Sequence, residues 1–243
     1  MRNFNIDKLD KIIKESINKV VLKEAMKFNF SFTKLEQMPS FKQRLEYCKE
    51  MLGVPIGRGS SRLVFQIDDE KCLKLAMNRK GLAQNQVEAQ NGNDYYIQSL
   101  IPKYYGELSD NENYTYIVTE YVIPVKESDF EWLVGVDYYT FQDLIRKEVN
   151  SINGLKGWKG LDADEINLVY ENGDNTMAEI IDYCVNYNVN PIEITDPRNL
   201  GMTKRDGNVI LVILDNGFND DIANQYYSRK KSLRHSFRND FFT

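Results

Sequence analysis

The stretch that decides the fold is GRGSSRLVFQI at residues 57–67, where a glycine-containing turn leads directly into β-branched and aromatic residues. Residues of these types between Arg62 and Asp68 predict a strand, and the polar residues 68–70 predict a tight turn after it. Residues 71–77 are mostly apolar and predict a second strand. We therefore expect an antiparallel hairpin immediately after the glycine turn.

Two well-known phosphate-binding loops do not fit residues 57–62. A Walker A loop needs a Gly-Lys-Ser/Thr ending, which is absent, and a Rossmann loop must run from a strand into a helix. A glycine turn between two antiparallel strands remains. Such a turn allows the backbone to approach phosphate groups closely, and its amides can then donate hydrogen bonds. A plain β-turn is the alternative for this stretch alone.

Further strands and helices are predicted in the first half of the chain. One helix is expected to begin near Ser40, and another covers about residues 81–93. Strands are expected at 104–108 and 114–122, with a polar turn between them. Short antiparallel hairpins with one inserted helix favour an α+β layer over alternating βαβ units.

The second half is predicted to be mostly helical. Residues 141–152 and 176–187 are the clearest helices. Residues 200–203 and 209–214 then read as two strands around Asp206-Gly207, a strong hairpin signal.

The first 38 residues are predicted to form a separate helical extension. Apolar residues recur there at helical spacing, and lysines occupy the opposite face. The apolar positions are Leu9, Ile13, Ile17, Val20 and Val21. A helix over residues 8–26 could pack on the domain or bind a partner protein, and both alternatives stay open.

A lysine stands in the middle of the second predicted strand. Lys74 lies in the run Cys72–Ala76, where a lysine is costly unless a partner keeps it charged. Glu88, in the following predicted helix, is the only acidic residue between Lys74 and Asp94. This arrangement resembles the protein-kinase family, in which a strand lysine holds the α- and β-phosphates of ATP and pairs with a helix glutamate. An exposed helix carboxylate is the alternative for Glu88.

Three later stretches resemble further kinase motifs. YIVTEYV at 116–122 resembles the last N-lobe strand running into the hinge, which implies that the backbone of Glu120–Val122 binds the adenine edge; an ordinary buried strand is the alternative. LDNG at 214–217 resembles the Asp-Phe-Gly motif, which makes Asp215 the implied Mg²⁺ ligand. Asn199 resembles the catalytic-loop asparagine that provides a second metal contact.

These motifs occur in the family's order between about residues 52 and 218. The resemblance implies an α+β, two-lobed protein-kinase-like fold with a five-stranded antiparallel N-lobe sheet and a reduced, mainly helical C-lobe. The implied boundaries are an extension at 1–38, an N-lobe at 39–124 and a C-lobe with a basic tail at 125–243. It also implies ATP and Mg²⁺ as ligands. The implied nucleotide-binding residues are Gly57, Gly59, Ser60, Ser61, Arg62, Lys74, Glu88, Glu120 and Val122, and the implied metal ligands are Asn199 and Asp215.

Several positions depart from the kinase pattern. Arg62 replaces the third glycine of the loop, where it could add a phosphate contact, and Asn216 replaces the phenylalanine of Asp-Phe-Gly. In the motif H-R-D-x-x-x-x-N the catalytic aspartate would fall at Ile194. Asp196 could serve as the base instead, or it could cap the loop, as aspartate before proline often does. Residues 218–243 are too few for a normal activation segment and large helical subdomain.

Two functions follow from these matches and departures. The first is an atypical kinase-like protein that binds ATP–Mg²⁺ and transfers phosphate to an unidentified acceptor, with Lys74 and Asp196 as its catalytic residues. The alternative is a catalytically impaired pseudokinase that acts as an interaction or virion-associated structural module.

Composition excludes or disfavours several other classes of function. The only histidine is His235, and the three cysteines are widely spaced, which excludes H-E-x-x-H metalloproteases and disfavours zinc or disulfide frameworks. A net charge of −5 argues against nucleic-acid binding, although basic residues cluster between Arg229 and Arg238.

The longest aliphatic run, Val209–Leu214, is too short to span a bilayer, so we expect a cytoplasmic protein. The lysine-, asparagine- and tyrosine-rich composition resembles proteins of bacteriophages that infect gut bacteria, which would place it in the host cytoplasm or the virion.

Overall fold

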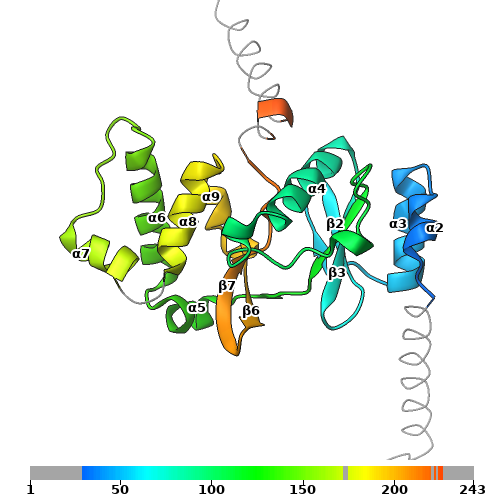
Figure 1. Cartoon of the computed structure of the whole chain (residues 1–243), viewed down its shortest axis with the longest axis horizontal. Coiled ribbons are helices and arrows are strands. Elements are labelled where there is room, and N and C mark those ends of the chain that lie inside the picture. The colour runs from blue at the N-terminus through cyan, green and yellow to red at the C-terminus, as the bar shows by residue number, and fades with distance from the viewer. Residues whose placement is uncertain (1–28, 172–174, 220–221, 223, 227–243) are drawn as a thin grey trace, which may run out of the picture.

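The computed structural model describes residues 29–171, 175–219, 222 and 224–226. Over these residues the chain is a mixture of helices and two antiparallel sheets, one with the strand order β1-β2-β3-β4 and one with the order β5-β6-β7. The predicted α+β class is confirmed. Figure 1 shows the two sheets near the middle, with most helices of the second half on one side and α2 and α3 at the opposite end.

The four-stranded sheet is built from β1 (Gly57–Arg58), β2 (Arg62–Gln66), β3 (Lys71–Ala76) and β4 (Tyr116–Glu120). Helices α2 (Phe32–Glu36) and α3 (Phe41–Leu52) cover one face, and α4 (Arg79–Gly92) lies against the other (Figure 1). The predicted hairpin after the glycine turn and the helices near Ser40 and over 81–93 are therefore confirmed.

The prediction of a five-stranded sheet is wrong, because residues 104–108 do not form a strand. Tyr104 makes one isolated bridge to Thr119, and the chain then turns into the 3-10 helix η2 (Gly106–Leu108). The backbone amide of Val118, which a longer strand could have bonded, donates instead to the Ser109 hydroxyl at 2.9 Å. A side chain thus replaces the backbone partner that a fifth strand would have supplied.

The second sheet contains β5 (Ile123–Pro124), β6 (Leu200–Arg205) and β7 (Asn208–Ile213). Asp206 and Gly207 connect β6 to β7 with φ angles of 52° and 85°. A tight two-residue hairpin turn of this kind requires positive φ at both positions, which explains the Asp-Gly pair. The predicted hairpin is confirmed.

Helices make up most of the remaining second half. The predicted helices at 141–152 and 176–187 correspond to α6 (Tyr138–Ile152) and α8 (Thr176–Asn186). Asp137 begins α6 by accepting hydrogen bonds from the amides of Tyr139 and Thr140. The other elements are α5 (Glu127–Val134), α7 (Ala163–Ile166), the π-helix η3 (Asn167–Glu171), α9 (Pro191–Ile194) and the 3-10 helices η1 (Tyr95–Ile97) and η4 (Pro197–Asn199).

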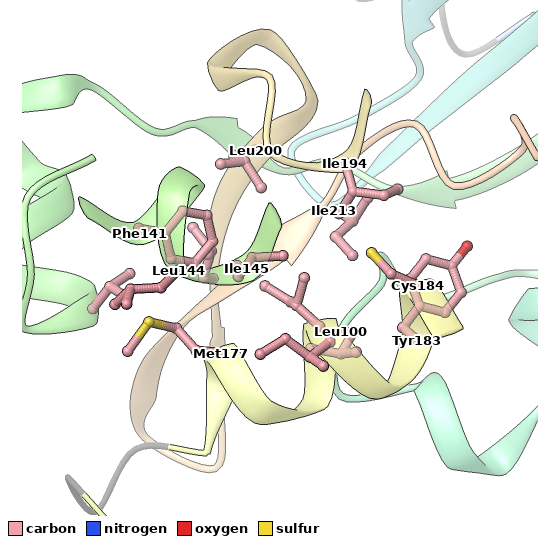
Figure 2. Packing of buried hydrophobic residues seen from close by; sticks show 14 of the residues in the cluster. Leu100, Phe141, Leu144, Ile145, Met177, Tyr183, Cys184, Ile194, Leu200 and Ile213 are labelled. Atoms are coloured by element: carbon pink, nitrogen blue, oxygen red, sulfur yellow. The ribbon is translucent and has the colours of Figure 1, made fainter. Parts of the chain in front are cut away.

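Two hydrophobic clusters lie on either side of the connection between β4 and β5. The first joins the four-stranded sheet to α2 and α3, and it includes the fully buried Leu35 from the region predicted to be an extension. The second joins α5, α6 and α8 to the β6–β7 hairpin (Figure 2). Leu100 and Ile101, which follow α4 and η1, also belong to this second cluster.

No helix among the described residues is long and apolar enough to cross a membrane. The predicted amphipathic helix at 8–26 and the basic tail at 229–238 lie outside the described residues.

Candidate functional site

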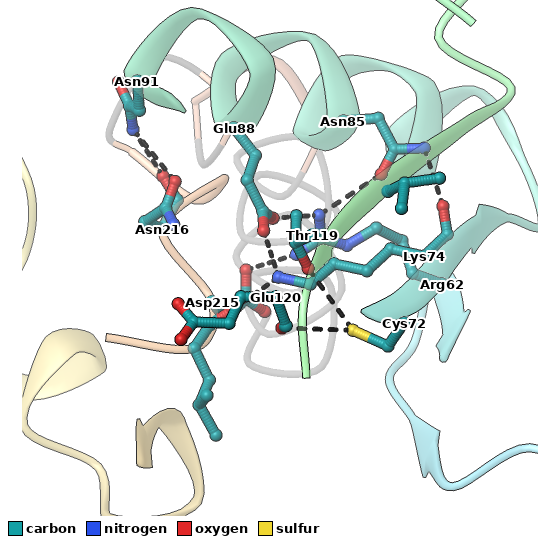
Figure 3. A network of polar contacts seen from close by, with 12 residues as sticks. Arg62, Cys72, Lys74, Asn85, Glu88, Asn91, Thr119, Glu120, Asp215 and Asn216 are labelled. Carbon is teal, nitrogen blue, oxygen red and sulfur yellow. Dashed lines mark hydrogen bonds and ion pairs between the residues drawn. The ribbon is translucent and has the colours of Figure 1, made fainter. Parts of the chain in front are cut away.

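Lys74 is the centre of a buried polar network (Figure 3). Alternate side chains of a strand point to opposite faces, so Leu73 and Leu75 join the cluster with α3 while Lys74 points toward α4. Its ammonium group contacts the carboxylate of Glu88 on α4 and donates to the backbone carbonyl of Leu214 at 2.7 Å. The structure thus brings together the lysine and glutamate that the sequence predicted as a pair.

The face of α4 toward the sheet is polar, which sequence reasoning missed. The buried residues on it include Gln84, Asn85, Glu88 and Asn91. Asn85, which is fully buried, donates to the carbonyls of Lys74 at 3.3 Å and Tyr114 at 2.9 Å. Polar residues at helical spacing usually indicate a solvated face. Only the buried network opposite them shows that this face is internal.

Arg62 lies beneath the glycine turn instead of projecting from it. Its guanidinium group is 2.5 Å from the Glu88 carboxylate and 2.5 Å from that of Asp215. It also donates to the Asn85 side chain at 3.3 Å. Burial alone would lower the pKa of Arg62, but the carboxylates of Asp215 and Glu88 outweigh that effect and raise it. Arg62 is therefore a permanent buried cation shared by two acids.

The glycine turn itself is a tight hairpin connection between β1 and β2. The Gly59 amide donates to the Arg62 carbonyl at 2.9 Å, and the Ser61 hydroxyl bonds the side chain of Gln84. The Ser60 hydroxyl lies 3.5 Å from the ammonium group of Lys80. The predicted loop therefore rests against the start of α4.

Gly81 makes this contact between the turn and α4 possible. A Cβ atom at Gly81 would lie 2.3 Å from the backbone oxygen of Ser61, whereas one at Gly59 would meet nothing nearer than 3.8 Å. The close approach of the helix therefore depends on the glycine of α4 and not on Gly59, a glycine of the loop.

The Asp215-Asn216-Gly217 segment follows β7 and is held against α4. Asn91 donates to the backbone oxygen of Asn216 at 2.8 Å, and the hydroxyl of Tyr183 on α8 donates to the same oxygen at 3.3 Å. A Cβ atom at Gly217 would lie 2.4 Å from a backbone oxygen of α4. Asn216, where kinases have phenylalanine, thus joins α4 to α8 through hydrogen bonds instead of apolar packing.

Asn199 lies beside this segment. Its backbone oxygen accepts from the Leu214 amide at 2.7 Å, which places the two implied metal ligands, Asn199 and Asp215, at the same end of the β6–β7 hairpin. The Asn199 side-chain amide nitrogen donates to the Glu193 carbonyl at 2.8 Å. This bond leaves the side-chain oxygen of Asn199 as the atom suited to a metal ion.

Asp196 shows the capping arrangement that the sequence allowed for it. Its carboxylate accepts from the amide of Arg198 at 2.9 Å and forms an ion pair with the Arg198 guanidinium at 2.6 Å. The side-chain hydrogen bond from Arg198 lowers the pKa of Asp196. Asp196 begins η4 in this way, and its bonding partner is Arg198 rather than a member of the Lys74 network.

The implied hinge is heavily hydrogen bonded. The amide of Glu120 donates to the Lys103 carbonyl at 2.8 Å, and that of Tyr121 donates to the Glu70 carbonyl at 2.7 Å. The Glu120 carboxylate bonds the Thr203 hydroxyl and lies 3.0 Å from the Arg205 guanidinium. The side chain of Glu120 therefore ties β4 to β6.

No protein-family model and no curated protein matches this sequence. The function must therefore be argued from the site itself. Arg62, Lys74, Glu88 and Asp215 come from four separate segments, and they combine two cations with two carboxylates in one network.

The donor set for a metal ion is small. No group of three or more histidine, cysteine, aspartate or glutamate side chains in the described part of the chain could hold a metal. Zinc sites need three or four protein ligands, whereas Mg²⁺ is usually bound by one or two carboxylates together with substrate phosphates and water. Asp215 and Asn199 meet this smaller requirement.

Proposed function

We propose that this chain is an atypical kinase-like protein that binds ATP together with Mg²⁺. The observation that carries the proposal is the placement of Lys74, whose ammonium group lies between the Glu88 carboxylate and the Leu214 carbonyl, next to Asp215. In kinases, a strand lysine paired with a helix glutamate binds the phosphates of ATP, and this arrangement matches that pair. The two-lobed kinase-like fold and the implied domain boundaries are part of this proposal.

Under this proposal, most of the predicted residues have defined roles. Glu88 positions the ammonium group of Lys74, which would bind phosphate oxygens. The turn from Gly57 to Arg62 would cover the phosphates, and the backbone of Glu120–Val122 would lie near the base. Asp215 and Asn199 would hold Mg²⁺. When bound, Mg²⁺ neutralises the charge on the transferred phosphoryl group.

A second candidate, a pseudokinase that binds nucleotide without transferring phosphate, is favoured by the environment of Asp196. A general base works best when its pKa is near the working pH, and the bond from Arg198 lowers the pKa of Asp196 instead. Positioning alone can still support slow transfer. In the pseudokinase case, the segment 8–26 would bind a protein partner, in a host cytoplasm or a virion.

Thermal shift and ATP turnover measured on the same samples separate these possibilities. We expect ATP with Mg²⁺ to stabilise the wild-type protein and not Lys74→Ala or Asp215→Ala. Lys71→Ala serves as the matched control, because Lys71 lies on the same strand but pairs with Asp68 and Glu70. Stabilisation without turnover or autophosphorylation would identify a pseudokinase. No stabilisation of the wild type would contradict nucleotide binding altogether.

A further inference from the structure

Arg62 is placed in the interior by the geometry of the sheet. Val64 lies opposite Lys74 in the β2–β3 pairing, and Arg62 precedes Val64 by two positions, so all three side chains leave the same face. Arg62 is only 6% exposed. A residue in a glycine-rich turn that merely contacted solvent or phosphate would not need to be buried in this way.

The contacts of Arg62 join three parts of the chain. One nitrogen of the guanidinium group bonds Glu88 on α4, and the other bonds Asp215 after β7, at 2.5 Å in each case (Figure 3). The Glu88 carboxylate also forms an ion pair with the ammonium group of Lys74. The two carboxylates and two cations balance in the absence of any ligand, so the site is electrostatically complete without a metal ion.

We propose that Arg62 is a built-in competitor of Mg²⁺ for the carboxylate of Asp215, and that it must leave this carboxylate before ATP–Mg²⁺ can bind. This inference rests on the proposed nucleotide-binding function and adds a form of regulation to it.

The competition follows from distance and charge. Mg²⁺ binds a carboxylate oxygen at about 2.0–2.1 Å, and the Oδ1 atom of Asp215 already accepts from the guanidinium group. A divalent ion at that oxygen would also repel the adjacent Arg62. The repulsion acts whichever oxygen of Asp215 the metal ion binds, because both oxygens belong to the carboxylate that the guanidinium group contacts.

Release of Arg62 from Asp215 is feasible because only one of its two ion pairs must break. Asp215 is the more exposed of the two acids, with 39% of its side chain accessible, whereas Glu88 is 2% accessible. The nitrogen bonded to Glu88 can keep its partner while the other turns away. Arg62 and Lys74 then share the Glu88 carboxylate, so each buried cation still contacts an acid.

Calorimetric titration of the whole chain with ATP, with and without Mg²⁺, tests this role. We expect Arg62→Gln to bind ATP–Mg²⁺ about tenfold more tightly than the wild type, because one charge-assisted ion pair no longer has to be broken. Lys71→Gln is the matched control, since it removes a cation from the β2–β3 hairpin that pairs with Asp68 and Glu70 instead of Asp215, and it should not tighten binding. The gain should appear only when Mg²⁺ is present, because the metal ion is what competes with Arg62 for the Asp215 carboxylate.

Arg62→Lys provides a second variant in case Arg62→Gln fails to fold. Lysine is a point charge and cannot bond two acids at once as the forked guanidinium group does. Its ammonium group should stay paired with Glu88 and leave Asp215 free, so this variant should also bind ATP–Mg²⁺ more tightly. Equal or weaker binding by folded Arg62 variants would overturn the inference but leave the proposed function intact, provided that Lys74→Ala still abolishes binding. Tighter binding of ATP that needs no Mg²⁺ would also overturn it. Absence of ATP binding in every variant would overturn both proposals.

Discussion

Replacing Glu88 by glutamine is the most informative test of the buried network. Glu88 is 2% exposed and is the shared partner of Arg62 and Lys74, which are 6% and 7% exposed. Glutamine keeps the shape and removes the charge, which leaves two buried cations facing a neutral amide. Removing one partner of a buried ion pair typically costs about 3–5 kcal/mol. We expect a loss in this range, which is a large part of the roughly 5–15 kcal/mol that holds a typical domain folded.

The free energy of unfolding can be measured by urea denaturation at neutral pH. Glu46→Gln is the matched control, because Glu46 pairs with Lys42 at 3.9 Å on the surface of α3, where both side chains are mostly exposed. An exposed pair of this kind contributes only about 0–0.5 kcal/mol. Since Lys74 and Glu88 are in contact, a double-mutant cycle with Lys74→Met should give a coupling energy of about 0.5–3 kcal/mol. A Glu88→Gln protein within about 1 kcal/mol of the wild type would refute the description of Glu88 as the anchor of two buried cations.

Three further outcomes are expected. Gly81→Ala should lose about 1–3 kcal/mol in urea denaturation because its Cβ would clash with the Ser61 oxygen, whereas Gly59→Ala should lose about 0.5 kcal/mol or less; equal losses would argue against this packing. Burial favours the protonated form of Asp110, but hydrogen bonds from Thr115 and from neighbouring amides outweigh it and lower its pKa. The wild type should therefore have a higher free energy of unfolding than Asp110→Asn at pH 7, and this difference should shrink as the pH falls below about 4. A difference that stays constant between pH 7 and pH 3 would contradict this. Asp196→Asn should leave ATP affinity unchanged, since asparagine also caps η4; calorimetry showing weaker binding would place Asp196 in the nucleotide site.

Local signals in the sequence were sufficient for several elements. The Asp206-Gly207 hairpin could be predicted because its turn depends only on those two residues. The pairing of Lys74 with Glu88 could be predicted because a lysine in an apolar strand needs a carboxylate, and the next helix offers one.

Other features depend on contacts that no local pattern shows. The predicted strand at 104–108 does not form, because the amide of Val118 donates its hydrogen bond to the hydroxyl of Ser109 and not to a strand backbone. The contact of Arg62 with Asp215 joins residues 153 positions apart. A residue that replaces a loop glycine was expected to face phosphate, and only the pleat of β2 shows that it faces inward.

The location of the bound nucleotide tests the central claim most directly. Photo-crosslinking with 8-azido-ATP and Mg²⁺, followed by peptide mapping, would identify the residues next to the base. We predict labelling within residues 57–66 or 118–124, competed by ATP, lost in Lys74→Met and retained in Lys71→Met. Labelling confined to other segments such as α6 or α8, or equal labelling of the wild type and Lys74→Met, would contradict the account.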